Sequence, residues 1–167
     1  MSAVVIRLVT SDDVPRVVAL VRAALSEFGL AFGEGSETDA QLLSLPASYE
    51  SRGGRFWVAA SEGGEIVGTC GVFPLGAGDW ELRKMYLDAA ARGQALGRRL
   101  LDEAVSFVRA AGARRIVLDT TERMTRAIAF YEAHGFVRDD AQVRGSRCSR
   151  GYALPLGEPP PRRDPSP

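Results

Sequence analysis

The sequence has little with which to bind a metal ion or to build a disulfide framework. Histidine occurs once, at His134, and cysteine occurs twice, at Cys70 and Cys148. Because no cluster of His, Cys, Asp and Glu has the spacing of metal ligands, we expect no metal site. Two cysteines are too few for a disulfide framework, and both fall in apparent strands, so we expect them to be buried free thiols.

Net charge and long apolar runs are also missing. Lys plus Arg number 21 and Asp plus Glu number 21, a balance that argues against a nucleic-acid or membrane-surface partner. No apolar run approaches the ~20 residues of a membrane-spanning helix, and no signal peptide opens the chain. We therefore expect a soluble, cytoplasmic protein. Its 167 residues, 46% of them hydrophobic, suit one domain with a substantial core.

Hydrophobic periodicity predicts alternating strands and helices. The expected strands are 3–9, 55–61, 65–73, 79–87, 115–120, 136–137 and 150–156, and the expected helices follow Thr10 up to Gly29 and then cover 38–45, 96–111 and 125–134. Pro46 is expected to stop the short helix, and 74–78 to turn the chain between two strands. The final residues, 157–167, are rich in proline and charge and cannot bury surface, so we expect a disordered tail after a domain of residues 1–156.

The segment 81–101 organises the rest of the chain. It is typical of a strand, a turn of small residues, and then a helix with apolar residues at helical spacing. The first turn of a helix presents backbone N–H groups that attract anions, phosphate above all. Gly93 and Gly97 let the backbone approach an anion closely, and Arg92 and Arg98 add positive charge. A tight strand-to-helix connection with solvated arginines is the alternative interpretation.

Two motifs in this order resemble those of the GNAT superfamily of N-acetyltransferases. The run Arg92-Gly93-Gln94-Ala95-Leu96-Gly97 resembles the acetyl-CoA signature Gln/Arg-x-x-Gly-x-Gly/Ala, with Ala95 where the family has Gly. The run 127–136 is similar to a late helix of the family with the pattern Ala-x-x-x-Tyr-x-x-x-Gly-Phe. The resemblance implies a single-domain α/β (α+β), GNAT-like acyl-CoA N-acyltransferase fold. Its mixed central sheet would have about six to seven strands, flanked by about four helices.

The resemblance also implies a reaction. An acetyl group would pass from acetyl-CoA to a primary amine of a small molecule, an amino acid or a protein, by direct attack through a tetrahedral intermediate. Tyr131 matches the family tyrosine that protonates the leaving thiolate, although it could instead be a core tyrosine. Glu81 is the candidate base, acting directly or through water, and its alternative is a salt bridge to a nearby Arg or Lys. Strand alternation places Glu81 on one face with Arg83, Met85 and Leu87.

The residues implied in binding acetyl-CoA form three groups: the end of the strand at 85–87, the turn at 92–98, and the end of the next strand at Thr120. In the family, two strands part at their ends and leave backbone groups, here those of 85–87, free to bond the pantetheine arm. Where the family often has an Asn at the end of the next strand, this chain has Asp119-Thr120-Thr121, and either Thr120 or Thr121 could take its role. The full set of candidates is Met85, Tyr86, Leu87, Arg92, Gly93, Gln94, Ala95, Leu96, Gly97, Arg98 and Thr120.

The acceptor is not encoded in a readable motif. Glu34, Glu37 and Asp39 could attract a cationic acceptor, although a solvated acidic loop explains them more simply. The alternative to an enzyme is a non-catalytic module of the same fold that senses an acyl-CoA. Dimers are common in the family, which leaves a homodimer open.

Overall fold

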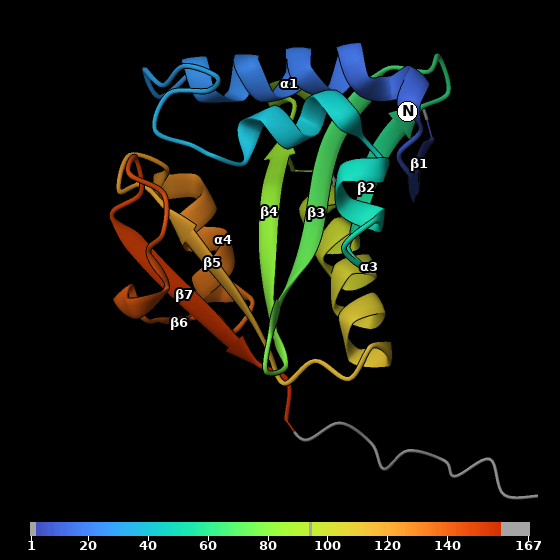
Figure 1. The fold of residues 1–167 in the computed structure, drawn as a ribbon. Coiled ribbons are helices and arrows are strands. Elements are labelled where there is room, and N and C mark those ends of the chain that lie inside the picture. Colours follow the sequence, from blue (N-terminus) through green and yellow to red (C-terminus); the bar gives the residue numbers. More distant parts are fainter. Residues whose placement is uncertain (1–2, 94, 158–167) are drawn as a thin grey trace, which may run out of the picture.

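In the computed structural model, which describes residues 3–93 and 95–157, the chain forms a seven-stranded sheet with helices on both faces (Figure 1). The strands are β1 (Val4–Leu8), β2 (Arg55–Ser61), β3 (Ile66–Gly76), β4 (Asp79–Leu87), β5 (Arg115–Thr120), β6 (Val137–Arg138) and β7 (Arg150–Pro155). The α-helices are α1 (Val14–Ser26), α2 (Ala47–Glu50), α3 (Leu96–Ala110) and α4 (Thr125–Ala133). Short 3₁₀ turns occupy Ser11–Asp13, Asp39–Ser44, Ala89–Ala91 and Asp140–Gln142.

The sheet is mixed, as predicted. Its strand order is β1-β2-β3-β4-β5-β7-β6, and neighbouring strands run antiparallel except β4 and β5, which run parallel. A parallel pair needs a crossover connection, which α3 supplies between these two strands. The predicted architecture of six to seven strands and about four helices is confirmed.

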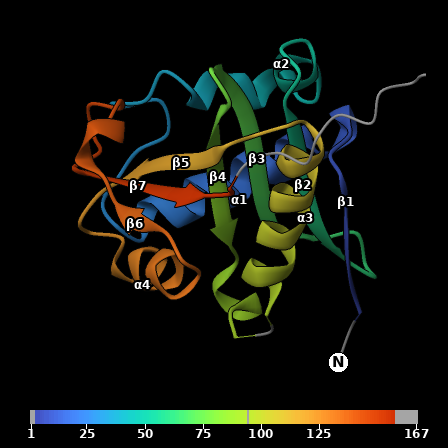
Figure 2. The same cartoon turned by 90° about the horizontal axis from the view of Figure 1, so that it is seen from below.

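Two hydrophobic cores lie on the two faces of the sheet. α1 covers one face, where Val17, Val21 and Leu25 are fully buried at helical spacing. α3 and α4 cover the other, where Leu100 and Ala104 of α3 are fully buried (Figure 2). Burying a side chain such as Leu100 contributes about 1.5–3 kcal/mol, so both faces help to hold β4 in the middle of the sheet.

β4 and β5 pair over a short length and then part. Their ladder joins Asp79–Glu81 to Arg115–Val117, and within the described residues no further rung links the two strands. Figure 1 shows the two ribbons diverging from this point. β4 pairs with β3 on its other edge. Beyond Glu81, the edge of β4 that faces β5 therefore has no neighbouring strand among the residues described.

A bulge divides β4 into two halves. β3 pairs Thr69 with Tyr86 and Gly71 with Arg83, so the single residue between Thr69 and Gly71 opposes two residues of β4. Lys84, one of those two, has a φ of 53°. The extra residue reverses the alternation of side chains that follow it.

The reversal corrects one sequence-based prediction. Glu81 and Arg83 share the α1 face, as the alternation predicts. Met85 and Leu87 lie on the α3 face instead, where they pack against the core that contains Trp80. The prediction that all four share one face is therefore wrong, because the bulge adds one residue between the two pairs.

Pro46 stops the short helix as predicted, because the 3₁₀ turn ends at Ser44 and Leu45 is extended, and the additional helix α2 begins after the proline at Ala47. Two other predictions needed correction. Pro74 lies within β3, which continues to Gly76, so the turn is shorter than expected. Cys148 lies in a loop and is half-buried, whereas Cys70 is buried in β3 as predicted. The predicted disorder of the tail concerns residues that are almost all outside the described ranges and stays a prediction.

Candidate active site

One cavity of about 930 Å³ occupies the gap between β4 and β5. Its walls come from β4, the start of α3, the end of β5, α4 and two loops. Its size is within the range of ligand sites in proteins. The cavity is lined by every predicted site residue that the structure describes, namely Glu81, Met85, Tyr86, Leu87, Arg92, Gly93, Ala95, Leu96, Gly97, Arg98, Thr120 and Tyr131. The remaining candidate, Gln94, lies outside the described residues.

The second half of β4 brings backbone groups to the cavity. Met85, Tyr86 and Leu87 all line it, along the edge of β4 that no strand covers in the part of the chain described. The side-chain hydroxyl of Thr69 donates to the carbonyl of Lys84 over 2.7 Å and so holds the bulge in place. An uncovered strand edge carries N–H and C=O groups that an extended ligand can bond.

The turn before α3 has the geometry of an anion site. Gly93 has a φ of 85°, and a β-carbon there would meet nothing within 4 Å, so its backbone is open to the cavity. Gly97 lies in the first turn of α3, where a β-carbon would come within 3.1 Å of the Phe130 ring. The absence of a side chain at Gly97 therefore lets α3 approach α4. The backbone amides in the first turn of α3 and the exposed side chain of Arg98 make this end of the cavity positive.

Ala95 adopts the left-handed conformation, with a φ of 57°. A residue with a β-carbon is strained in this region by roughly 1–2 kcal/mol, whereas glycine is not. This backbone requirement explains physically why glycine suits the position. Ala95 directly precedes α3 as its N-cap, so helix compatibility does not govern this position.

Tyr131 projects from α4 and is buried, with 7% of its surface exposed. Its ring packs against Phe136, with the ring centroids 5.4 Å apart. Burial raises the pKa of Tyr131, so its hydroxyl stays protonated at neutral pH. The residue thus combines core packing with a place on the cavity wall, and the two interpretations of its role are compatible.

Glu81 is buried and paired. Its carboxylate accepts hydrogen bonds from the guanidinium groups of Arg83 and, over 3.3 Å, of Arg144. Arg83 also donates to Gln41 and stacks on Phe73, which fixes its position. The salt bridge considered as the alternative for Glu81 is therefore present, and two arginines already balance the charge of the carboxylate.

A buried ion cluster behind Glu81 was not predicted. Asp39 has no exposed surface and accepts hydrogen bonds from Lys84 and Arg147. Burial alone would raise the pKa of Asp39, but the bonds from Arg147 and Lys84 outweigh it and lower this pKa to about 2. Glu34 and Glu37 are exposed, as a solvated loop requires, so the expectation of a solvated acidic loop is wrong for Asp39 alone.

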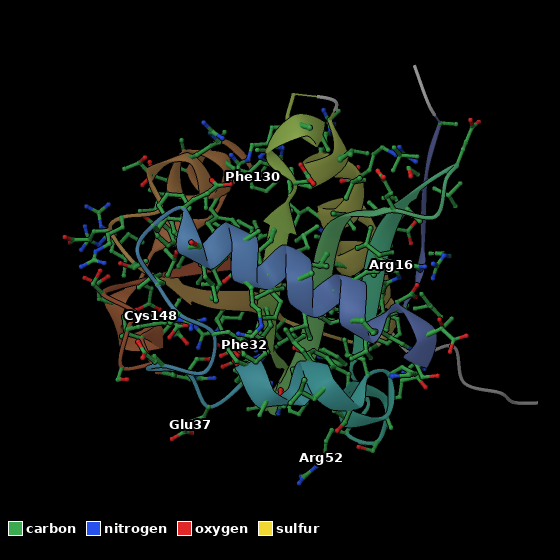
Figure 3. All side chains as sticks on the ribbon, turned by 90° about the horizontal axis from the view of Figure 1, so that it is seen from above. Arg16, Phe32, Glu37, Arg52, Phe130 and Cys148 are labelled. Atoms are coloured by element: carbon green, nitrogen blue, oxygen red, sulfur yellow. The ribbon has the colours of Figure 1, made fainter. Side chains whose placement is uncertain are left out.

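Thr120 lies at the end of β5 on the cavity wall. Its hydroxyl points to the sulfur of Met124 at 3.6 Å, and its backbone carbonyl accepts from the amide of Ser149. Thr120 therefore anchors the loop between β6 and β7, which contains Ser149, to the end of β5. Figure 3 shows this loop, at Cys148, on the same side of the molecule as the loop that carries Phe32 and Glu37.

Comparison with known proteins identifies the family. A family model described as the acetyltransferase (GNAT) family matches residues 19–136. The chain is 36% identical to the uncharacterized N-acetyltransferase YjgM of Escherichia coli K12 over 140 residues. This match covers 81% of this chain and 83% of the relative. The chain belongs to the GNAT acetyltransferase family.

Solved structures share the GNAT fold. The crystal structure of a GNAT-family acetyltransferase from Staphylococcus aureus matches with a TM-score of 0.85 and 24% identity, over 92% of this chain and 99% of that one. The PaiA N-acetyltransferase of Thermoplasma acidophilum, solved in complex with coenzyme A, matches with a TM-score of 0.75 and 20% identity, over 92% and 99%. The family membership makes the protein an acyltransferase enzyme.

Two further observations concern what the GNAT domain contains. No described helix is long and apolar enough to cross a membrane. Across residues 3–93 and 95–157, no group of three or more His, Cys, Asp and Glu is arranged to hold a metal ion.

Proposed function

We propose that this GNAT enzyme transfers the acetyl group of acetyl-CoA to a primary amine by direct attack through a tetrahedral intermediate. The observation that carries the proposal is one cavity that connects the start of α3, the uncovered edge of β4 and Tyr131. The anion-attracting helix start suits a diphosphate, and the uncovered strand edge suits an extended arm with amide groups. Membership in the GNAT family supports the same cosubstrate.

The residues present fit coenzyme A. The turn at Gly93 is open, the amides of the first turn of α3 follow it, and Arg98 adds an exposed charge. Arg92 contributes its backbone more than its charge, because its guanidinium is already paired with Glu27 over 2.9 Å. These groups would hold the diphosphate, and the β4 edge from Met85 to Leu87 would hold the arm and orient the thioester.

We propose that Tyr131 is the general acid. When the tetrahedral intermediate collapses, the carbon–sulfur bond breaks and the leaving thiolate needs a proton. The hydroxyl of Tyr131 keeps its proton at neutral pH because burial raises its pKa, so it is available as a donor. The hydroxyl would then regain a proton from the acceptor nitrogen or from water.

Glu81 remains our candidate for the base, with a water molecule as the preferred relay. Its carboxylate oxygens each accept one hydrogen bond, from Arg83 and from Arg144, and the two positive charges beside them disfavour direct contact with an ammonium group but leave acceptor sites for a water molecule. A water between Glu81 and the amine would remove the proton without separating these pairs. The amine must be neutral before it attacks, because an alkyl ammonium has a pKa near ~10 in water.

The first experiment follows thiol release from acetyl-CoA with a panel of primary amines. We expect release with at least one class of amine, and Tyr131→Phe should lower kcat by about 100-fold or more with the Kd for coenzyme A unchanged. Tyr152→Phe is the matched control, because Tyr152 is a fully buried tyrosine that bonds Glu132. Unchanged turnover in Tyr131→Phe would remove Tyr131 from the mechanism.

A non-catalytic acyl-CoA sensor is the second candidate. The strained Ala95 and the paired Glu81 favour it, since both depart from an optimised catalytic site. Coenzyme A should raise the melting temperature under either function. Thiol release that stays at the buffer rate with every amine, while coenzyme A binds, would favour the sensor.

A further inference from the structure

We infer that the acceptor carries a carboxylate beside its amine, and that the guanidinium of Arg144 binds this carboxylate. The inference rests on the proposed function and names the class of its second substrate. It begins from the charge of the cavity wall. Among the described lining residues, seven are Lys or Arg, namely Arg83, Lys84, Arg92, Arg98, Arg126, Arg144 and Arg147, and three are acidic, namely Glu37, Glu81 and Asp119.

The cations near Glu81 differ in how fully they are engaged. The side chains of Lys84 and Arg147 are 5% and 13% exposed and both bind Asp39. Arg83 is 12% exposed and is held by Glu81 and other partners. Arg144 is 45% exposed, and in the described structure its guanidinium makes one bond, of 3.3 Å, to Glu81. Since a guanidinium has five N–H donors, Arg144 retains most of its capacity.

The loop that carries Arg144 is fixed. The backbone amides of Arg144 and Gly145 both donate to a carboxylate oxygen of Asp119, each over 2.8 Å. The amide of Arg147 donates to the carbonyl of Gly35 over 3.3 Å, which ties the loop to the opposite wall. The carboxylate of Asp119 thus accepts from backbone amides and leaves the guanidinium of Arg144 to Glu81, which orients it. In this orientation the remaining N–H groups of Arg144 can bind a planar anion such as a carboxylate.

The phosphates of coenzyme A are a poor match for Arg144. The phosphate-attracting amides lie at the start of α3, beyond the C-terminal end of β4. Arg144 contacts Glu81, six residues before the last residue of β4, a distance of about 20 Å along the strand. The two positive regions therefore lie at opposite ends of the uncovered β4 edge. An acceptor whose carboxylate pairs with Arg144 would enter from the end that the diphosphate does not occupy.

The test compares carboxylates with their amides. Acetyl-CoA is the only acyl donor, so any dependence on a carboxylate arises from the acceptor. The panel contains L-amino acids with acidic, apolar and aromatic side chains together with β-alanine and γ-aminobutyrate, each beside its carboxamide. We expect kcat/KM to be at least about 10-fold higher for the acids than for the amides, mainly through KM.

Variants assign this preference to a residue. Arg144→Gln should abolish the preference by raising KM for the acids about 10-fold or more, with KM for acetyl-CoA unchanged, and Arg144→Lys should retain part of it. Arg138→Gln is the control, because Arg138 is an exposed arginine on β6 that pairs with Asp140 away from the cavity. It should keep the wild-type preference. Melting temperatures of the variants verify that each is folded.

A binding measurement separates this inference from the proposed function. Coenzyme A-loaded protein is titrated by calorimetry with N-acetyl amino acids and with their carboxamides. Tighter binding of the acids, lost in Arg144→Gln, supports the inference even if no amine in the panel is acetylated. Acids and amides that are acetylated equally well leave the proposed function intact and overturn the inference. Equal binding of the two product series also overturns it.

Discussion

The two ends of the cavity are built by different means. The end formed by the turn 92–98 uses consecutive residues, and its chemistry is that of backbone amides at a helix start. The end around Glu81 uses side chains from segments far apart in the chain, joined by buried ion pairs such as Asp39–Lys84 and Asp39–Arg147. If the proposed function holds, backbone geometry serves the cosubstrate, which is the same throughout the family. Side chains joined by ion pairs then serve the acceptor, in which enzymes of one fold differ.

The difference has an energetic side. At the turn, Arg98 is 72% exposed and pairs with a similarly exposed Asp102, and such exposed pairs contribute little to stability. Asp39 is fully buried between two cations, and removing one member of such a cluster leaves a buried charge without its partner. We therefore expect substitutions at the Glu81 end to cost stability and those at the turn to alter coenzyme binding.

The largest effect should come from Asp39→Asn. This change leaves Lys84 and Arg147 without their carboxylate, and we expect the free energy of unfolding to fall by about 3–5 kcal/mol in urea denaturation. Glu37→Gln is the control, because Glu37 is a nearby exposed acid, and it should change stability by about 0.5 kcal/mol at most. A loss below about 1 kcal/mol in Asp39→Asn would erase the energetic contrast between the two ends.

The pH dependence of stability should sharpen the same contrast. The pKa of Asp39 is about 2 in the folded protein and near ~3.9 when unfolded, so its contribution is complete above about pH 5 and declines as the pH falls toward 2. The stability difference between wild type and Asp39→Asn should therefore shrink by about 2 kcal/mol between these pH values. Asp13, whose pKa is also about 2, is present in both proteins and cancels. A difference that is constant with pH would contradict the assignment.

A smaller effect is expected at the turn. Arg98→Gln should weaken coenzyme A binding about threefold to fivefold at low salt, and less at high salt, because exposed charges are screened. Arg99→Gln is a matched control on the next residue, since the guanidinium of Arg99 donates to the carbonyl of Val4 over 2.9 Å. Isothermal titration at two ionic strengths measures both. Equal losses in the two variants would show that only overall charge matters at this end.

The smallest effect should come from Ala95→Gly. Glycine relieves the left-handed strain but loses more entropy on folding, so we expect a net gain of about 0.5–1 kcal/mol in the free energy of unfolding. Ala77→Gly is the control, because Ala77 has a similar φ of 54° in the turn between β3 and β4, away from the cavity. Both variants should gain stability in urea denaturation, whereas a change in coenzyme A affinity should be confined to Ala95→Gly.

Sequence reasoning succeeded where structure is local. It predicted the bounds of β4 and β5 because each strand is a short run with clear ends, and α3 to within one residue because Leu96 opens an apolar pattern that Gly112 closes. The residues of the turn could be brought to one cavity because they are adjacent in the chain. Their roles in binding and catalysis remain predictions.

The other end could not be predicted because its contacts are distant in sequence. Asp39 lies 45 positions from Lys84 and 108 from Arg147, and nothing in the spacing of an acidic loop marks one of its members as buried. The bulge at Lys84 is decided by pairing with β3, so alternation within β4 alone gave the wrong face for Met85 and Leu87. Arg144 was overlooked because its loop carries no motif.

The bulge in β4 also bears on how such an enzyme could acquire a new substrate. It places the side chains of Glu81 and Arg83 on one face of the sheet and those of Met85 and Leu87 on the other, so the two halves of β4 contact different parts of the molecule. A duplicated gene could accumulate substitutions in the first half, and in the loop of Arg144, without altering how the second half meets the cosubstrate. Specificity for the acetyl donor could then be kept while specificity for the acceptor changes, although one strand contributes to both.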